Sequence, residues 1–276
     1  MIDFGMPFSY NYTNAAHKSL IAADSGRSAQ IRGGYSMNTV LFDLDGTLLP
    51  MDMTEFTEGY FKYLVKMLAP HGYDPKELIK NVWGGTAAMV KNDGSCMNEA
   101  AFWNYFTGVY GEKSREDMPI FDEFYATEFK NARQFCGFNK MAAEIVRMLK
   151  ERGYRVALAT NPLFPSTATR QRINWAGLEP DEFELYTTYE NIGYCKPNLD
   201  YYREVMRRLN VEPEDCLMVG NDVGEDMVAE KLGMKVFLLT DCMINKDNED
   251  IDQWPHGNFD DLKAYLDKEY ETRETV

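Results

Sequence analysis

The stretch that decides the fold is Thr39-Val40-Leu41-Phe42-Asp43-Leu44-Asp45-Gly46-Thr47. Its first four residues form an unbroken apolar or β-branched run, which then stops at acidic and turn-forming residues. A short continuous run of this kind is typical of a strand buried on both faces, as in a parallel sheet. Residues two apart leave a strand in the same direction, so Asp43 and Asp45 are predicted to face one crevice.

Four later segments repeat this form, and each is an apolar run that ends in polar or turn residues. They are residues 155–160, 184–188, 216–220 and 235–239. Helical patterns lie between them, and one of these begins at Asn139 as an N-cap and ends near Gly153. Strands that alternate with helices predict an α/β fold with a doubly wound, Rossmann-like parallel sheet.

The segment between the first two strands is much longer than a single crossover helix requires. Asp52 and Glu55 form a capping pair at its start. Further helical patterns cover residues 75–89, 97–108 and 117–131. We therefore predict an inserted α-helical cap domain. The predicted boundaries are 52–138 for the cap, and 37–51 with 139–276 for the core.

Residues 1–36 lack a sustained apolar period and are rich in Ser, Asn, Gly and Ala. This composition predicts an unstructured leader. Met37 directly precedes the first strand, and Arg32-Gly33-Gly34 can be encoded by a purine run like a bacterial ribosome-binding site. We therefore expect the functional protein to begin at Met37.

The bulk composition excludes several function classes. A net charge of −15 argues against a nucleic-acid partner, which needs a basic surface. No apolar run is long enough for a membrane span, and the first residues lack the pattern of a secretory signal. The five scattered cysteines predict reduced thiols in the cytoplasm. The three histidines lack metal-ligand spacing, which disfavours zinc chemistry and a serine–histidine triad.

Polar side chains follow three of the predicted strands. Asp43 and Asp45 follow the first strand, Thr160-Asn161 ends the second, and Asn221-Asp222 follows the fourth. Lys196 and Asp226 complete the set. Ligands of open α/β sheets bind beyond the carboxyl ends of the strands, so these residues are predicted to meet in one crevice.

Each of these features alone also has a structural explanation. The paired aspartates and Thr160 can cap turns or helices, Lys196 can be a solvated surface charge, and the acidic segment can be a helix N-terminus. Crowded carboxylates, however, are unfavourable unless a cation or a proton relieves them. The order of the features and their placement after strands favour a single site.

This order resembles that of the haloacid dehalogenase superfamily, over residues 38 to about 268. Its D-x-D-G-T motif is matched by residues 43–47, its second motif at Thr160, its third at Lys196, and its acidic fourth motif by residues 221–226. A cap between the first and second motifs resembles the helical cap subclass, whose subfamily IA contains phosphatases.

The resemblance implies a phosphatase mechanism. Asp43 would attack phosphorus and form an aspartyl-phosphate that water later hydrolyses. Asp45 would protonate the leaving oxygen and then take a proton from the water. Lys196 would neutralise Asp43 and the phosphoryl group, and Thr160 would hydrogen-bond the transferred oxygens.

The resemblance also implies Mg²⁺ as the cofactor. Its expected ligands are Asp43, the backbone carbonyl of Asp45, and the acidic motif with Asn221, Asp222 and Asp226. Family members often read G-D-S where this chain reads Gly220-Asn221-Asp222. We therefore expect Asp222, rather than Asn221, to supply the motif's carboxylate ligand.

The expected substrate is a small phosphorylated metabolite. The candidate residues for binding it are Thr47, Asn161, Lys91 and Asn92, together with Thr86, Trp103 and Phe164. A phosphomutase with the same motifs is an alternative, and so is a non-enzymatic binding module on the same fold. A dehalogenase is disfavoured because such enzymes typically lack an acid at the position of Asp45.

Overall fold

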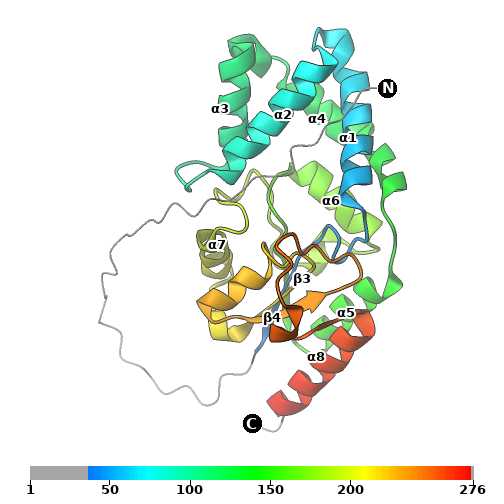
Figure 1. Cartoon of the computed structure of the whole chain (residues 1–276), viewed down its shortest axis with the longest axis vertical. Coiled ribbons are helices and arrows are strands. Elements are labelled where there is room, and N and C mark those ends of the chain that lie inside the picture. The colour runs from blue at the N-terminus through cyan, green and yellow to red at the C-terminus, as the bar shows by residue number, and fades with distance from the viewer. Residues whose placement is uncertain (1–36, 275–276) are drawn as a thin grey trace. The chain divides into compact units, whose positions relative to one another are not determined.

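The computed structural model describes residues 37–274, which are built around a sheet of five parallel strands (Figure 1). The strands are β1 (Thr39–Phe42), β2 (Arg155–Leu158), β3 (Cys216–Gly220), β4 (Lys235–Leu239) and β5 (His256–Gly257). Their spatial order is β2-β1-β3-β4-β5. This is the order of a doubly wound sheet, so the predicted fold class is confirmed.

The register aligns the carboxyl ends of the three central strands. Phe42 pairs with Leu158 of β2 on one side and with Val219 of β3 on the other. The amide of Asp43 then donates to the carbonyl of Val219 at 2.9 Å, which fixes where the chain leaves β1. The segments that follow β1, β2 and β3 therefore emerge at one edge of the sheet.

Helices cover both faces of this sheet. Leu41, Ala157 and Met218 of three strands share a buried cluster with α7 (Leu199–Leu209). Two further helices, α5 (Lys140–Glu151) and α8 (Phe259–Glu274), pack against each other and against the sheet, and Figure 1 shows them on the opposite side from α7. The remaining core helix is α6 (Ser166–Trp175), which follows β2.

Four α-helices lie between β1 and α5 and make up the predicted insert. They are α1 (Met53–Leu68), α2 (Pro75–Val90), α3 (Asn98–Tyr110) and α4 (Met118–Thr127). The carboxylate of Asp52 caps α1 by accepting from the amides of Thr54 and Glu55, as predicted. α2 and α3 lie side by side (Figure 1).

Short 3-10 helices join many of these elements. They are η1 (Ala69–His71), η2 (Glu112–Arg115), η3 (Phe129–Phe135), η4 (Pro180–Glu182), η5 (Pro213–Asp215), η6 (Met227–Leu232) and η7 (Ile251–Gln253). The helix predicted over residues 117–131 is divided between α4 and η3. The N-cap predicted at Asn139 is confirmed, because its side chain accepts from the amide of Met141.

The insert is joined to the sheet domain at two linkers that are paired with each other. Met51 and Cys136 form an antiparallel bridge, and the amide of Gly137 donates to the carbonyl of Pro50 at 2.6 Å. The chain therefore enters and leaves the insert at one place.

A second connection lies at Asn98, the first residue of α3, which is completely buried. Its side-chain amide donates to the carbonyls of Pro162 and Tyr194, both at 3.2 Å, and to the thiol sulfur of Cys195. Its backbone amide donates to the carbonyl of Ile192. The beginning of α3 is thus bound to the loops that follow β2.

Some predictions differ from the structure. The strand predicted over residues 184–188 forms only one ladder bridge, between Tyr186 and Leu158, and runs as an irregular edge segment beside β2. The second edge is the two-residue strand β5, which is too short to give a periodic signal. Residues 37–274 contain no helix that is both long and apolar enough to cross a membrane.

The predicted domain boundaries remain a prediction, because the structure divides the described residues into no smaller compact units. The predicted leader, residues 1–36, lies outside the described residues, and the start at Met37 also remains a prediction.

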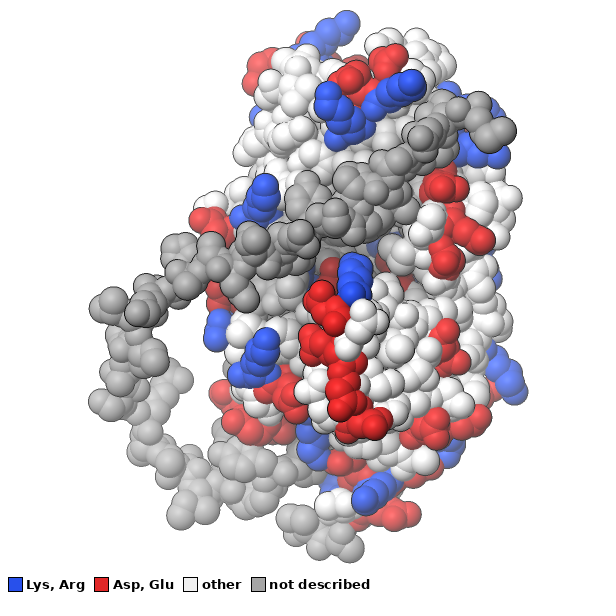
Figure 2. Space-filling model, viewed as in Figure 1, with Lys and Arg blue, Asp and Glu red and all other residues white. Residues whose placement is uncertain are grey.

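The surface carries the excess of acidic residues. Figure 2 shows acidic side chains over much of the visible face, with lysine and arginine scattered among them instead of forming a patch. An anionic ligand must therefore find its positive charge locally, inside a site.

Candidate active site

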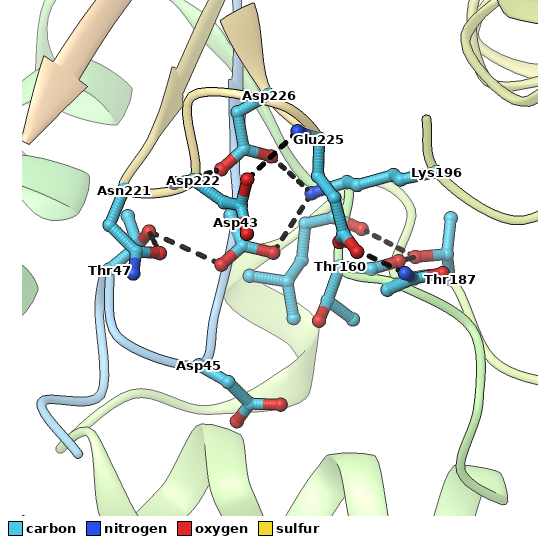
Figure 3. Close-up of polar contacts among 12 residues, drawn as sticks. Asp43, Asp45, Thr47, Thr160, Thr187, Lys196, Asn221, Asp222, Glu225 and Asp226 are labelled. Atoms are coloured by element: carbon cyan, nitrogen blue, oxygen red, sulfur yellow. Dashed lines mark hydrogen bonds and ion pairs between the residues drawn. The ribbon is translucent and has the colours of Figure 1, made fainter. Parts of the chain in front are cut away.

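Asp43, the first residue after β1, lies at the centre of a polar cluster (Figure 3). It is only 7% exposed, and different groups contact its two carboxylate oxygens. The ammonium group of Lys196 donates to Oδ1 at 2.9 Å, and the hydroxyl of Thr47 donates to Oδ2 at 3.2 Å. These two contacts fix the orientation of a carboxylate at the mouth of the sheet.

Lys196 joins Asp43 to Asp226. Its Nζ also donates to Oδ1 of Asp226 at 2.6 Å, and both side chains of this second pair are 1% exposed. Burial by itself would lower the pKa of Lys196, but the carboxylates of Asp226 and Asp43 outweigh this effect and raise it above its usual value. Lys196 is therefore a buried, charged bridge between two elements of the site.

The segment after β3 contributes more carboxylates than Lys196 can neutralise. Burial raises the pKa of Asp226 to about 7 even though Lys196 opposes the shift. Burial and the charge of Asp222 raise the pKa of Glu225 to about 8. Glu225 Oε2 accepts from the side-chain amide of Asn161 at 3.0 Å. This concentration of buried acid is the situation that a bound cation relieves.

Asn221 lies directly beside the carboxylate of Asp43. Its Oδ1 lies 2.9 Å from the hydroxyl of Thr47, whose single proton is shared between this oxygen and Asp43 Oδ2. Its Nδ2 donates to the carbonyl of Cys242, which turns the amide oxygen toward Asp43. Asp222 instead uses Oδ1 to accept from the amides of Gly224 and Glu225, as a turn cap.

Asp45 stands apart from the group around Lys196 (Figure 3). Its Oδ2 forms an ion pair with Arg172 of α6, whereas its Oδ1 is buried without a hydrogen-bond partner among residues 37–274. Burial raises the pKa of Asp45 to about 6, although Arg172 acts in the opposite direction. A carboxyl group with such a pKa exchanges protons readily near neutral pH.

Thr160, two residues beyond β2, is also buried at the cluster. Its carbonyl accepts from the hydroxyl of Thr187 at 2.6 Å and from that of Tyr201 at 2.8 Å. These bonds anchor the backbone at the point where the Thr160 side chain enters the site (Figure 3).

Comparison with known proteins agrees with this arrangement. The family model of haloacid dehalogenase-like hydrolases matches residues 37–233. The chain belongs to this family. A pyrophosphatase, PpaX of Bacillus cereus, is 25% identical over 203 residues, which cover 72% of this chain and 81% of the relative.

Solved structures of this family share the fold at low sequence identity. A 2-haloacid dehalogenase from Pseudomonas syringae superposes with a TM-score of 0.57 at 20% identity, covering 84% of this chain and 99% of that one. A predicted phosphoglycolate phosphatase from Haemophilus somnus gives 0.52 at 17% identity, covering 83% and 98%. The predictions of the superfamily and of a haloacid dehalogenase-like phosphatase as the enzyme class are thereby confirmed.

As a haloacid dehalogenase-like hydrolase, the chain brings most of its predicted site residues together. The contacts above join Asp43, Thr47, Lys196, Asn221 and Asp226, with Thr160 and Asp222 at the margins of the same group (Figure 3). Asn161 is connected to this group by its hydrogen bond to Glu225. The roles assigned to them remain predictions.

The cap residues predicted to bind substrate have contacts within the insert. Asn92 donates to the carbonyl of Cys96 and to Asn98, both at 2.9 Å, and Lys91 is the exposed C-cap residue that follows α2. Thr86 bonds back to the carbonyl of Val82 in its own helix. Trp103 packs among the aromatic rings of the cap. None of these contacts reaches Asp43.

Sequence reasoning missed Arg172 and Glu225. A lone arginine in a polar helix and one more acid in an acidic motif carry no distinctive signal. Only the position of Glu225 inside the motif Gly220–Asp226 pointed toward the site.

The donor chemistry of the cluster fits a hard divalent cation. Every nearby ligand atom is an oxygen, and Asp43 Oδ2 and Asn221 Oδ1 share one hydroxyl donor. No group of three or more His, Cys, Asp or Glu side chains within residues 37–274 is arranged as a complete metal site. Mg²⁺ is one ion that prefers oxygen ligands of this kind.

Proposed function

We propose that this chain is a Mg²⁺-dependent phosphohydrolase that cleaves a small phosphate monoester through an aspartyl-phosphate on Asp43. The observation that carries the proposal is the double anchoring of Asp43, by Lys196 at Oδ1 and by Thr47 at Oδ2. A carboxylate held at a strand end in this way is oriented for in-line attack on phosphorus.

The reaction has two half-reactions, and each residue of the cluster has a separate role in them. Asp43 attacks phosphorus while Asp45 donates a proton to the oxygen that leaves. In the second half-reaction Asp45 accepts a proton from the water that attacks the aspartyl-phosphate. Lys196 neutralises charge on Asp43 and on the phosphoryl group, and the Thr160 hydroxyl donates to a phosphoryl oxygen.

Mg²⁺ would be held by Asp43, the carbonyl of Asp45 and one oxygen of the acidic motif. When bound, it neutralises the charge of the phosphate and orients it. The hydrogen bonds of Asn221 support its amide oxygen as that ligand, because Cys242 and Thr47 orient it beside Asp43. With these three oxygens as ligands, Asp226 is not needed for the metal and keeps its hydrogen bond to Lys196.

Several observations support the wider proposal of a small metabolite as substrate and a cytoplasmic setting. The side chains of the cluster are buried, and the positive charge of Lys196 lies within it, which suits a small anionic ester. All five cysteines are free thiols, as expected in a reducing compartment. The resemblance to PpaX makes pyrophosphate one compound to include in a substrate panel.

The proposal is tested by phosphate release from 4-nitrophenyl phosphate with Mg²⁺, with a chelator, and after Mg²⁺ is restored. We expect activity to disappear in chelator and to return with Mg²⁺. Asp43→Asn should abolish turnover and acid-stable labelling of the protein, whereas Asp181→Asn, at an exposed aspartate of η4, should change neither. Undiminished activity in chelator, or labelling of Asp43→Asn, would contradict the proposal. Product analysis for an isomerised sugar phosphate separates a hydrolase from a mutase.

A further inference from the structure

Arg172 is a buried cation that none of the family motifs contains. It lies on α6 and is completely buried. Arginine is almost never fully buried unless its charge is paired, since desolvating an unpaired guanidinium is very costly. Its position therefore depends on the groups that surround it.

Three contacts fix the plane of its guanidinium. Nη1 forms the ion pair with Asp45 Oδ2, and Nη2 donates to the hydroxyl of Thr169 at 3.3 Å. The guanidinium carbon lies 4.4 Å from the centre of the Phe164 ring. Arginine is suited to this position because its planar group can stack on a ring and pair with a carboxylate simultaneously.

The ion pair is one-sided. Asp45 Oδ2 is bound by Arg172 Nη1, whereas Asp45 Oδ1 and Arg172 Nε are both buried without a partner among the described residues. A pair that served stability alone would be expected to use both oxygens, because arginine binds carboxylates best in a bidentate manner. An unpaired buried oxygen carries a desolvation cost and so requires an explanation.

We propose that Arg172 is a positioning residue for Asp45, which it holds by Oδ2 so that Oδ1 is the atom that carries and transfers the proton. The proposal rests on the proposed phosphohydrolase function. As Asp43 forms its bond to phosphorus, the bond from phosphorus to the leaving oxygen breaks, and that oxygen keeps the electron pair and takes the proton from Asp45 Oδ1. The carboxylate left on Asp45 is stabilised by Arg172. In the second step, water bonds to phosphorus and gives a proton to Asp45 Oδ1, the bond from phosphorus to Asp43 breaks, and Asp43 leaves as a carboxylate.

The same arrangement connects the acid to the cap. The ring of Phe164 contacts three aromatic residues of the insert, with centroid distances of 6.4 Å to Phe56, 5.6 Å to Tyr60 and 6.1 Å to Phe129. The guanidinium of Arg172 thus lies between Asp45 and a ring that packs in the aromatic core of the cap. Docking of the cap therefore helps to fix the position of the acid.

The test compares two leaving groups in two backgrounds. 4-Nitrophenyl phosphate needs little protonation of its leaving group, whereas phenyl phosphate needs more. Arg172→Met and Arg172→Lys are made in the wild type and in Asp45→Asn, and kcat/KM is measured for both esters. Arg170→Met is the matched control, since Arg170 is an exposed arginine of the same helix. Thermal unfolding checks that each variant is folded.

We expect Arg172→Met to lower kcat/KM for phenyl phosphate by about 100-fold and for 4-nitrophenyl phosphate by less than about 10-fold. Arg172→Lys should recover part of the loss, and Arg170→Met should lose nothing. In Asp45→Asn the further change from Arg172→Met should stay below about 3-fold, because the acid it positions is already gone.

If Arg172→Met does not fold, Phe164→Leu carries the comparison, because it keeps Arg172 and removes the ring beneath it. It should give a smaller loss that is again greater for phenyl phosphate. Equal losses for the two esters, or an undiminished loss in Asp45→Asn, would overturn the proposal and assign Arg172 a structural role. A wild type that hydrolyses neither ester and takes no label would instead overturn the proposed function, and this inference with it.

Discussion

Replacing Lys196 by methionine removes the cation that bridges two buried carboxylates. Its Nζ lies 2.9 Å from Asp43 Oδ1 and 2.6 Å from Asp226 Oδ1, and the three side chains are between 1% and 10% exposed. Removing one partner of a buried ion pair typically costs about 3–5 kcal/mol, because the remaining charge is left desolvated. Methionine keeps most of the side-chain volume, so the cavity contribution is small. We expect Lys196→Met to reduce the free energy of unfolding by about 3–5 kcal/mol.

Urea unfolding at neutral pH measures this loss, with an unchanged m-value as the sign that only stability has changed. Lys235→Met is the control, because Lys235 pairs with Glu269 at the surface and is 45% exposed, so its loss should cost less than about 1 kcal/mol. With Asp226 already replaced by Asn, the cost of Lys196→Met should fall by about 1–3 kcal/mol. Equal costs for the two lysine variants, or no reduction in the Asp226→Asn background, would refute the reasoning.

Three further predictions concern the Asn98 connection between the insert and the sheet domain, the turn at Gly46 that follows Asp43, and the charge of Glu204. Asn98→Ala should lower the free energy of unfolding in urea by about 2 kcal/mol or more, because it leaves the buried carbonyls of Pro162 and Tyr194 unpaired. A loss below about 0.5 kcal/mol, as expected for a surface substitution, would be inconsistent with this prediction. Gly46→Ala should lower kcat by more than about 10-fold, because the new Cβ would lie 2.4 Å from Asn221 Nδ2. Gly72 also has a left-handed backbone but no atom near its Cβ position, so Gly72→Ala should lower stability and leave kcat unchanged. Hydrogen bonds from Arg207 and Arg208 lower the pKa of Glu204 from 4.5 to about 2. The ionised Glu204 therefore contributes its full stabilisation of the fold above pH 4.5, and this contribution is lost as the pH falls toward about 2. The melting temperature of Glu204→Gln should therefore lie slightly below that of the wild type at pH 7 and converge with it in acid, and a difference that does not depend on pH would contradict this.

The sheet could be predicted from the sequence because each central strand is a continuous apolar run that is buried on both faces. This signal is present in β1, β2, β3 and β4. Because the polar residues follow the ends of these strands, their meeting at one edge of the sheet could be predicted as well. The segment over residues 184–188 carries a similar pattern but lies at an edge, where pairing on one side does not force a regular ladder.

Arg172 shows what sequence reasoning cannot reach. Arg170, two residues earlier in α6, is exposed, whereas Arg172 is completely buried, and nothing in the local pattern separates them. The difference is made by Asp45 and Phe164, which are distant in the chain or belong to another element. Burial of a charge is decided by long-range packing, and local periodicity reports only which face of a helix is apolar.

The orientation of two neighbouring side chains in the acidic motif is a similar case, and their roles as metal ligands remain predictions. From charge alone, Asp222 is the better ligand for a hard cation than Asn221. The contacts give Asp222 a capping role and turn the amide oxygen of Asn221 toward Asp43. The path of the backbone after β3 decides whether the side chain of Asn221 or that of Asp222 points toward Asp43. The amino-acid sequence of the motif does not determine this path.

The paired linkers at Met51 and Cys136 have a consequence for how this protein can change. Because the insert begins and ends at one bridged point, it interrupts the sheet domain at a single place in the chain, as a long loop would. The length of the insert can therefore change without a change in the order of the strands, but new helices would have to form the contacts of Asn98 and Phe164 again. Selection for a new substrate can act on the helices of the insert, while the strand ends that carry Asp43 and Thr160 belong to the sheet domain.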